Sequence, residues 1–247
     1  MSMEARIKTI PFATQDYISV QHGDERIDMY VTEPAGGVTP STGMMLLMHG
    51  WGNNGMEAYA QESLEYADQL DLVVTRVEYR NSGREARNPL PGSTTDMPYD
   101  FSKFQTIDCL RAAYATLQLY PQISRERLIL WGGSQGGHLG AQCLIFAPHL
   151  WALAVLTCGV YVPLTYDEAQ AQGFSLDLRM HPGNGFVQAA LGVENRFEPA
   201  EEDIRNPVRN ATLMPENVPV ILLHGTGDQT VDARHSMSMY ALSLIHI

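Results

Sequence analysis

Short apolar segments alternate with longer amphipathic segments along most of the chain. A continuous apolar run is typical of a strand buried on both faces of a parallel sheet, whereas apolar residues three and four positions apart are typical of a helix with one buried side. The expected strands are residues 44–48, 72–79, 127–131, 153–157 and 220–223, and the expected helices are 59–70, 104–119, 135–146 and 233–244. This alternation predicts an α/β fold, in which helices flank a mostly parallel sheet.

The N-terminal part of the chain shows a different pattern. Residues 17–22 and 26–32 alternate apolar and polar side chains around the turn Gly23-Asp24. Alternation with a period of two predicts strands with one buried face, and a short Gly-Asp turn between them predicts an antiparallel hairpin. We therefore expect this hairpin at one edge of the sheet.

Two long segments interrupt the pattern of strands and helices. Residues 81–99 are rich in Gly, Pro, Ser and Thr and follow the carboxyl end of an expected strand, where open α/β sheets place their ligands. Residues 161–217 are too long for an ordinary crossover and contain five prolines, so we expect a lid with helices of its own, one of them at 186–191. We expect residues 1–247 to form one domain that includes this insertion.

Composition and charge narrow the candidate functions. Hydrophobic residues make up 45% of the chain and charged residues 18%, as in ordinary globular proteins. The formal net charge of −12 argues against binding to nucleic acids or anionic membranes, since both require basic surfaces. The sequence shows neither a signal peptide nor an apolar segment of membrane-spanning length, which favours a cytoplasmic protein.

The chain has three cysteines, Cys109, Cys143 and Cys158, each in an apolar segment. An odd number of widely spaced cysteines favours reduced thiols in the core over a disulfide framework or a metal site. We expect neither a metal ion nor a cofactor.

The strongest catalytic signal is the pattern Gly132-x-Ser134-x-Gly136 between an expected buried strand and an expected helix. In this setting the pattern is typical of a nucleophile elbow, where a sharp turn exposes the serine hydroxyl and glycines avoid a clash between strand and helix. The free N–H groups at the start of the helix face the oxyanion of an acyl-transfer reaction, and the amide of Gln135 is the natural first donor. The alternative is an ordinary glycine-rich turn.

A second glycine-rich turn, His49-Gly50-Trp51-Gly52, follows the expected strand 44–48. The amide of Trp51 is the candidate for the second oxyanion donor, and Trp51 and Gly50 are candidates for substrate contacts. Two questions stay open here. Trp51 either lines the acyl pocket or packs in the core, and His49 either takes part in catalysis or braces the loop through hydrogen bonds.

A third turn, residues 224–232, follows the expected buried strand 220–223 and carries two carboxylates. A buried carboxylate here would accept a hydrogen bond from the Nδ1–H of an imidazole, which fixes the tautomer and stabilises the imidazolium. Asp228 is the preferred catalytic acid, because serine before aspartate is the chain order of nucleophile-elbow hydrolases. Asp232 is the alternative, although its position just before an expected helix favours a capping role.

Several of these segments together resemble one known family. The quoted segments are WGGSQGG at 131–137, Asn206-Pro207, and VPVILLHGTGD at 218–228 with His235-Ser236 and Met239-Tyr240. They resemble the catalytic domain of prolyl-oligopeptidase-type serine hydrolases, within the α/β-hydrolase superfamily, and the similarity covers most of residues 44–240. The resemblance implies that Ser134 is the nucleophile and Asp228 the acid. Family peptidases commonly carry a large β-propeller before this domain, and small single-domain esterases resemble the layout of this chain better.

The resemblance also implies a catalytic histidine on a loop that follows one more helix and a final strand. The chain continues for 19 residues beyond the acid, and the expected helix 233–244 occupies most of them. His235 and His246 fall near the start and the end of that segment, where neither is expected to face Ser134. Residues 242–247 match the translated end of a transposase adaptor used in sequencing libraries, so we expect a non-native tail and a chain without its base and last strand.

Three functional hypotheses follow. The leading one is a serine hydrolase that cleaves a carboxylic ester or related acyl compound through an acyl-serine intermediate, without a cofactor. The second is a serine peptidase of the prolyl-oligopeptidase type. The third is a non-catalytic α/β-hydrolase that binds a small ligand in the same pocket.

Overall fold

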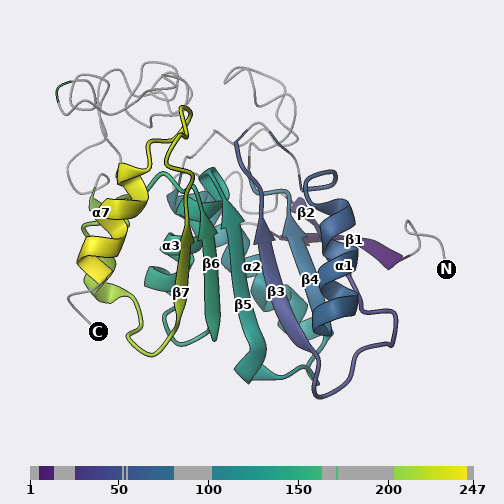
Figure 1. Ribbon diagram of the computed structural model, residues 1–247. Coiled ribbons are helices and arrows are strands. Elements are labelled where there is room, and N and C mark those ends of the chain that lie inside the picture. The colour runs from purple at the N-terminus through teal and green to yellow at the C-terminus, as the bar shows by residue number, and fades with distance from the viewer. Residues whose placement is uncertain are drawn as a thin grey trace.

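The computed structural model describes residues 6–13, 26–51, 53, 55–80, 102–162, 171 and 203–243. Figure 1 shows these residues as one sheet with helices packed against it. The strands and helices in chain order are β1 (Ile7–Ala13), β2 (Arg26–Thr32), β3 (Gly43–Met48), α1 (Ala60–Leu70), β4 (Leu72–Val77), α2 (Lys103–Leu119), β5 (Leu128–Gly133), α3 (Gln135–Phe146), β6 (Leu153–Thr157), β7 (Val220–Leu223) and α7 (Arg234–Ser243). The loop 81–99, the helix expected at 186–191 and most of the expected lid lie outside the described residues.

The sheet has seven strands in the order β1-β2-β4-β3-β5-β6-β7. The five strands from β4 to β7 in this order run parallel to one another, and β1 and β2 are antiparallel additions at one edge. The strands predicted at 153–157 and 220–223 coincide with β6 and β7, and the other three parallel strands differ from their predicted bounds by two residues or fewer at each end. The predicted α/β architecture is therefore confirmed.

β2 forms as expected, but its antiparallel partner along its whole length is β1, a strand that the sequence did not predict. β4 pairs with Met29–Thr32 on the other side of β2. The first strand of the predicted hairpin, residues 17–22, lies outside the described residues. Ile7 lies opposite Thr32, and the antiparallel register continues along the whole of β1. A period of two identifies a half-buried strand but does not select its partner, which is why the pattern did not reveal β1. Residues 14–25 themselves lie outside the described part of the chain.

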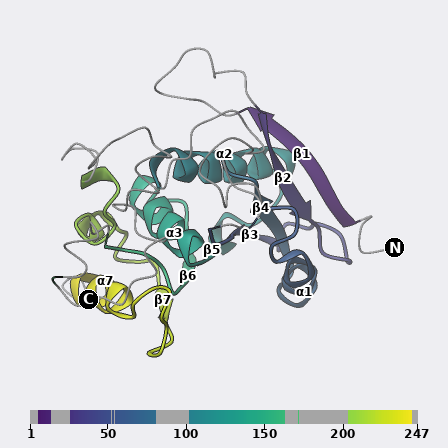
Figure 2. The same ribbon diagram turned by 90° about the horizontal axis from the view of Figure 1, so that it is seen from above.

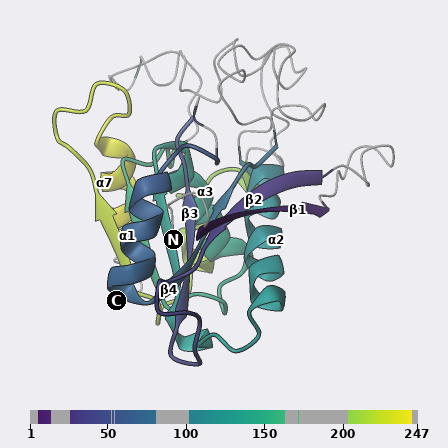
Figure 3. The same cartoon turned by 90° about the vertical axis from the view of Figure 1, so that its right-hand side faces the viewer.

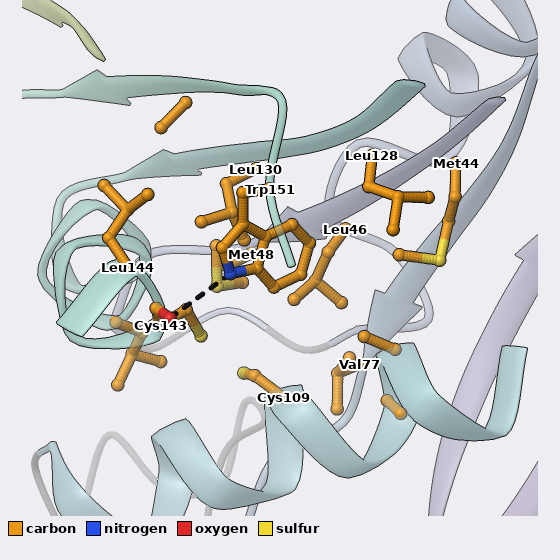
Figure 4. Close-up of a cluster of buried hydrophobic side chains, with 14 of the residues drawn as sticks. Met44, Leu46, Met48, Val77, Cys109, Leu128, Leu130, Cys143, Leu144 and Trp151 are labelled. Carbon is orange, nitrogen blue, oxygen red and sulfur yellow. Dashed lines mark hydrogen bonds between the residues drawn. The ribbon is translucent and has the colours of Figure 1, made fainter. Parts of the chain in front are cut away.

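Helices cover the two faces of the sheet unequally. Figure 2 and Figure 3 show α2 and α3 together on one face and α1 on the other. The larger core lies between the sheet and the α2–α3 layer, and Figure 4 shows its centre, where Met48 of β3 and Leu130 of β5 pack beside Cys143 of α3. There the indole N–H of Trp151 donates to the Cys143 carbonyl at 3.2 Å. Cys143 and Cys109 are buried free thiols, as predicted for core cysteines.

β7 differs from the buried strand that its apolar sequence predicts. Ile221 and Leu223 are 45% and 52% exposed, and they alternate with the half-buried Val220 and Leu222. β7 has β6 as its only strand partner among the described residues, and α1 packs against β4, away from this edge. An apolar run therefore identified the strand correctly but not how deeply it is buried, because burial depends on neighbouring layers.

Candidate active site

Ser134 lies at the turn between β5 and α3, as predicted for the nucleophile. Its backbone has φ 57° and ψ −118°, a combination that strains an L-residue and persists only when the surroundings hold it. The Ser134 amide donates to the carbonyl of Thr157 on β6 at 2.9 Å, and the Ser134 carbonyl accepts from the amide of His138 at 3.2 Å. The neighbouring strand and the helix therefore both fix this residue, which stays partly exposed.

Close backbone packing explains the two glycines of the motif. A Cβ atom on Gly132 would come within 2.1 Å of the carbonyl oxygen of Gly136, and a Cβ on Gly136 would come within 2.2 Å of the carbonyl oxygen of Met48. Both obstacles are main-chain atoms, so no side-chain rotation could relieve the clash. An ordinary surface turn has no such requirement, and this geometry favours the elbow interpretation.

The turn after β3 lies directly against Ser134. A Cβ on Gly50 would be 3.3 Å from the Ser134 Cβ and 3.7 Å from its Oγ, so the Gly50 backbone adjoins the hydroxyl. The amide of Asn53 donates to the Gly50 carbonyl at 3.3 Å and closes the turn. Trp51 lies within this turn and is half-buried. The structure thus brings Gly50 and Ser134 together, while the Trp51 amide as oxyanion donor remains a prediction.

His49 has the environment of a bracing residue. Its Nδ1–H donates to the Gly50 carbonyl at 2.8 Å, and the Tyr79 hydroxyl donates to the His49 carbonyl at 2.7 Å. The His49 and Tyr79 rings also stack, with centroids 4.3 Å apart. Complete burial lowers the pKa of His49 to about 4, against the opposing effect of its bond to Gly50. A neutral imidazole tied to its own loop favours the bracing alternative over catalysis.

Two buried charged residues at β4 hold the segment that follows this turn, and neither was singled out from the sequence. Arg76 is 1% exposed, and its Nη1 donates to the carbonyls of Gly55, Met56 and Ala58 at 2.9, 2.7 and 3.1 Å. Burial lowers the pKa of Arg76 to about 10. Glu78 accepts from the Gly55 amide at 2.6 Å. The available signal was a charge inside an apolar strand, since a buried charge needs partners.

Asp228 lies in the turn after β7, and hydrogen bonds from its own loop hold its carboxylate. Oδ1 accepts from the amides of Thr230 and Val231 at 2.8 and 3.0 Å. Oδ2 lies 3.5 Å from Nε2 of His224, whose N–H already donates to the Val231 carbonyl at 2.8 Å. The Asp228 side chain is 23% exposed, so it is less buried than predicted, because the strand before it lies at the edge of the sheet. One oxygen is fully engaged, and the other is the one that remains for an imidazole N–H.

Asp232 has the capping role that the sequence offered as its alternative. Its Oδ1 accepts from the amide of Arg234 at 2.9 Å, and its carboxylate forms an ion pair with the Arg234 guanidinium at 2.8 Å. α7 begins at Arg234, one residue later than expected. This geometry favours Asp228 over Asp232 as the acid.

The strand ends that carry Ser134 and Asp228 are linked through the end of β6. Thr157 accepts from the Ser134 amide, and the next amide along, that of Cys158, donates to the carbonyl of Leu223 at 2.7 Å. Burial raises the pKa of the half-buried Cys158 thiol, and the charge of Asp228 adds to this effect. Cys158 is thus no core thiol, contrary to the prediction, because it follows β6 at the rim of the sheet. The candidate nucleophile and the candidate acid therefore both lie where the parallel strands end, on either side of β6.

The two histidines near the C-terminus differ in what the structure describes. His235 is in the first turn of α7, is 1% exposed, and accepts through Nδ1 from the amide of Val162 at 3.1 Å. His246 lies outside the described residues. His224 is held by Ser236, whose hydroxyl lies 2.7 Å from Nδ1, and by the Val231 carbonyl. The imidazoles of His235 and His224 are thus both hydrogen-bonded to neighbouring residues, as expected for structural histidines.

Within the described ranges of the chain, no group of three or more His, Cys, Asp or Glu side chains is arranged to hold a metal ion. No helix within those ranges combines the length and apolar character needed to cross a membrane.

Comparisons with solved structures agree with this architecture. The chain aligns with a puromycin hydrolase at a TM-score of 0.70 and 20% identity, covering 96% of this chain and 33% of that one. It aligns with the acylaminoacyl peptidase of Pyrococcus horikoshii at a TM-score of 0.64 and 16% identity, covering 98% and 35%. At these identities the likeness shows the fold, which confirms the predicted α/β-hydrolase architecture. The chain spans about a third of the length of these proteins.

Sequence comparisons identify the family. The uncharacterized peptidase YtmA of Bacillus subtilis is 30% identical over 174 residues, which are 70% of this chain and 58% of that protein. The model of the prolyl oligopeptidase family matches residues 102–243, a range that includes Ser134 and Asp228 and more than half of the chain. The chain therefore belongs to the prolyl oligopeptidase family.

Proposed function

We propose that this domain is a serine hydrolase that cleaves acyl compounds, carboxylic esters first among them, through an acyl-serine intermediate. The observation that carries the proposal is the strained backbone of Ser134, with φ 57°, set against the Gly50 turn. Strain of this kind is retained where it serves a purpose, and here it holds a hydroxyl beside two turns that can supply amide donors.

The proposed reaction uses the residues in distinct ways. Ser134 Oγ attacks the acyl carbon and gives its proton to a general base, while the carbonyl oxygen becomes an oxyanion that accepts from the amides of Gln135 and Trp51. Collapse of this intermediate expels the leaving group, which takes the proton from the base. Water then attacks the acyl-serine in the same way and releases the acid. Asp228 would orient the base, an imidazole, through Oδ2, the oxygen that its own loop leaves less engaged.

Peptide hydrolysis is the second candidate, because the relatives described above include proteins named as peptidases. The two reactions differ in what they require of the base. An activated ester expels a stabilised phenolate with little help, whereas an amine leaves only after it receives a proton. Esters are therefore the substrates on which a site of this kind is tested first.

Labelling with a fluorophosphonate probe tests the proposal on the protein with the histidine loop and final strand that the family resemblance implies. We expect a covalent adduct on Ser134, located by peptide mass spectrometry, and no adduct in the Ser134→Ala variant. Hydrolysis of p-nitrophenyl acetate and of an N-acylated aminoacyl anilide, measured side by side, would then separate esterase from peptidase preference. Absence of an adduct on this folded protein would contradict the proposal and favour ligand binding without catalysis.

A further inference from the structure

A chain of buried side-chain amides connects the nucleophile turn to the neighbouring helix α2. Gln135, the residue after the nucleophile, is 1% exposed, and its Nε2 donates to Oε1 of Gln105 at 2.6 Å. Gln105 is fully buried on α2, and its Nε2 donates to the main-chain carbonyl of Arg80 at 2.9 Å. A carbonyl oxygen can only accept, so the Arg80 carbonyl fixes which end of the Gln105 amide faces Gln135.

A buried ion pair holds Arg80, whose carbonyl accepts the last hydrogen bond in this series of amides. The Arg80 guanidinium donates through Nε and Nη2 to the two carboxylate oxygens of Asp108 at 2.8 and 2.7 Å. The Arg80 amide also donates to Asp108 Oδ2 at 3.1 Å, and both side chains are at most 1% exposed. Asp108 lies one helical turn after Gln105 on α2. Because the pair is bidentate and includes the main chain, the position of the Arg80 carbonyl is closely defined.

Apolar side chains would fill this space at less cost. Each buried amide must find partners for its polar atoms, and a missing partner is destabilising. A hydrogen bond is directional, so a hydrogen-bonded pair of side chains holds each in one rotamer more strictly than an apolar contact does. Gln135 begins α3, so its side-chain rotamer and the orientation of its own main-chain amide are constrained together.

We infer that Gln105 is a positioning residue for the oxyanion hole, which acts by holding the Gln135 side chain against the Arg80–Asp108 pair so that the Gln135 amide faces the reacting carbonyl. This inference rests on the proposed function, in which that amide is a donor. Gln105 does not touch the substrate in this scheme. Its effect passes through one hydrogen bond, and this makes the effect separable from a general loss of stability.

A double-mutant cycle tests the inference on the protein with the histidine loop and final strand that the family resemblance implies. The variants are Gln105→Met, Gln135→Met and the double variant, which remove the amides but keep side chains of similar length. The control is Thr75→Val, which removes a buried 2.8 Å hydrogen bond between Thr75 of β4 and Thr116 of α2. The measured quantity is the rate of Ser134 labelling by the fluorophosphonate, well below each variant's unfolding temperature.

We expect each Gln variant to label about tenfold more slowly than the wild type, and the double variant to be no slower than either single variant, because all three lose the same bond. Thr75→Val should stay within about twofold of the wild type. The inference is overturned if Gln105→Met is no slower than the control, or if the losses of the two single variants multiply in the double variant. If Gln105→Met fails to fold, Gln135→Met against the control decides the question.

Hydrogen–deuterium exchange separates this inference from the proposed function. If the wild-type chain does not label at Ser134, the proposed function fails, and the positioning of α3 is then judged by exchange alone. We expect amides in residues 135–140 to exchange several-fold faster in Gln105→Met than in Thr75→Val. Equal exchange in the two variants would overturn the inference whether or not the chain labels.

Discussion

Two turns at the carboxyl ends of the parallel strands carry the proposed nucleophile, Ser134, and the proposed acid, Asp228. We call them the nucleophile turn and the acid loop, and different forces hold them. Around Ser134 the main chain of β3, β5 and α3 is packed so closely that Gly132 and Gly136 admit no Cβ. Around Asp228 the neighbouring glycines, Gly225 and Gly227, would place a Cβ in open space. Crowding from distant segments fixes the first site, whereas hydrogen bonds within a few residues fix the second.

This difference follows from the place of each strand in the sheet. β5 has a strand partner on both sides and helices nearby, while β7 lies at the edge and exposes Ile221 and Leu223. A strained residue such as Ser134 needs a surrounding structure that over-determines it, and the close packing at the centre of the sheet provides this. A carboxylate loop needs less support, because its own amides can satisfy it.

The largest expected effect is a clash at the nucleophile turn. Gly136→Ala places a Cβ 2.2 Å from the Met48 carbonyl oxygen, so the backbones of β3 and α3 must separate. We expect the free energy of unfolding in urea to fall by about 5 kcal/mol or more, because the Cβ clashes with main-chain atoms. Gly225→Ala is the matched control in the acid loop and should change stability by less than about 0.5 kcal/mol. Similar losses in the two variants would remove the contrast between the regions.

The next effect concerns the ion pairs of the two regions. Asp108→Asn removes the negative charge that the buried Arg80 guanidinium contacts at 2.7 Å, and we expect a loss of about 3–5 kcal/mol in the free energy of unfolding. Arg234→Ala breaks the partly exposed pair with Asp232 and should cost less than about 1 kcal/mol. Chemical denaturation of both variants checks this, and a small loss in Asp108→Asn would mean that water reaches the Arg80 site.

The pH dependence of the free energy of unfolding tests the burial of His49, in the turn beside Ser134. The pKa of His49 is lowered from 6.5 to about 4, so between these values the unfolded chain binds a proton that the folded chain does not. Neutral His49 makes its full contribution to the free energy of unfolding above pH 6.5. This contribution is lost as the pH falls toward 4, and the loss reaches about 2 kcal/mol at pH 5. Urea unfolding at pH 8 and pH 5 should show a smaller decrease in His49→Gln than in the wild type. Equal decreases would place His49 in contact with solvent.

The smallest effect is expected in the acid loop. Asp228→Ala removes the acceptor for the amides of Thr230 and Val231, and we expect a loss of about 1 kcal/mol because water can replace part of these bonds. Asp228→Asn keeps one carbonyl oxygen and should lose less. Thermal unfolding of the two variants measures the difference. A loss in Asp228→Ala as large as that in Asp108→Asn would show that distant contacts hold this loop too.

The residues that the sequence missed are those whose partners lie far along the chain. Arg76, Arg80 and Asp108 have no motif around them, and each acquires its role only when β4, α2 and the turn after β3 meet. The same limit applies at the N-terminus, since the alternation of β2 did not reveal that β1 is its neighbour. Local patterns report a residue's own strand or helix, and long-range pairing is decided by the whole fold.

The sequence by itself determined the parallel strands, the helices between them and the position of Ser134 at a strand-to-helix turn. These follow from apolar periodicity and from glycines at fixed spacing, which act within a few residues. Only the tertiary structure decided that β7 is half exposed, that Asp228 is held by its own loop, and that a buried amide chain joins Gln135 to Arg80. These features depend on which segments lie beside one another, and burial and hydrogen-bond partners exist only once the layers have packed.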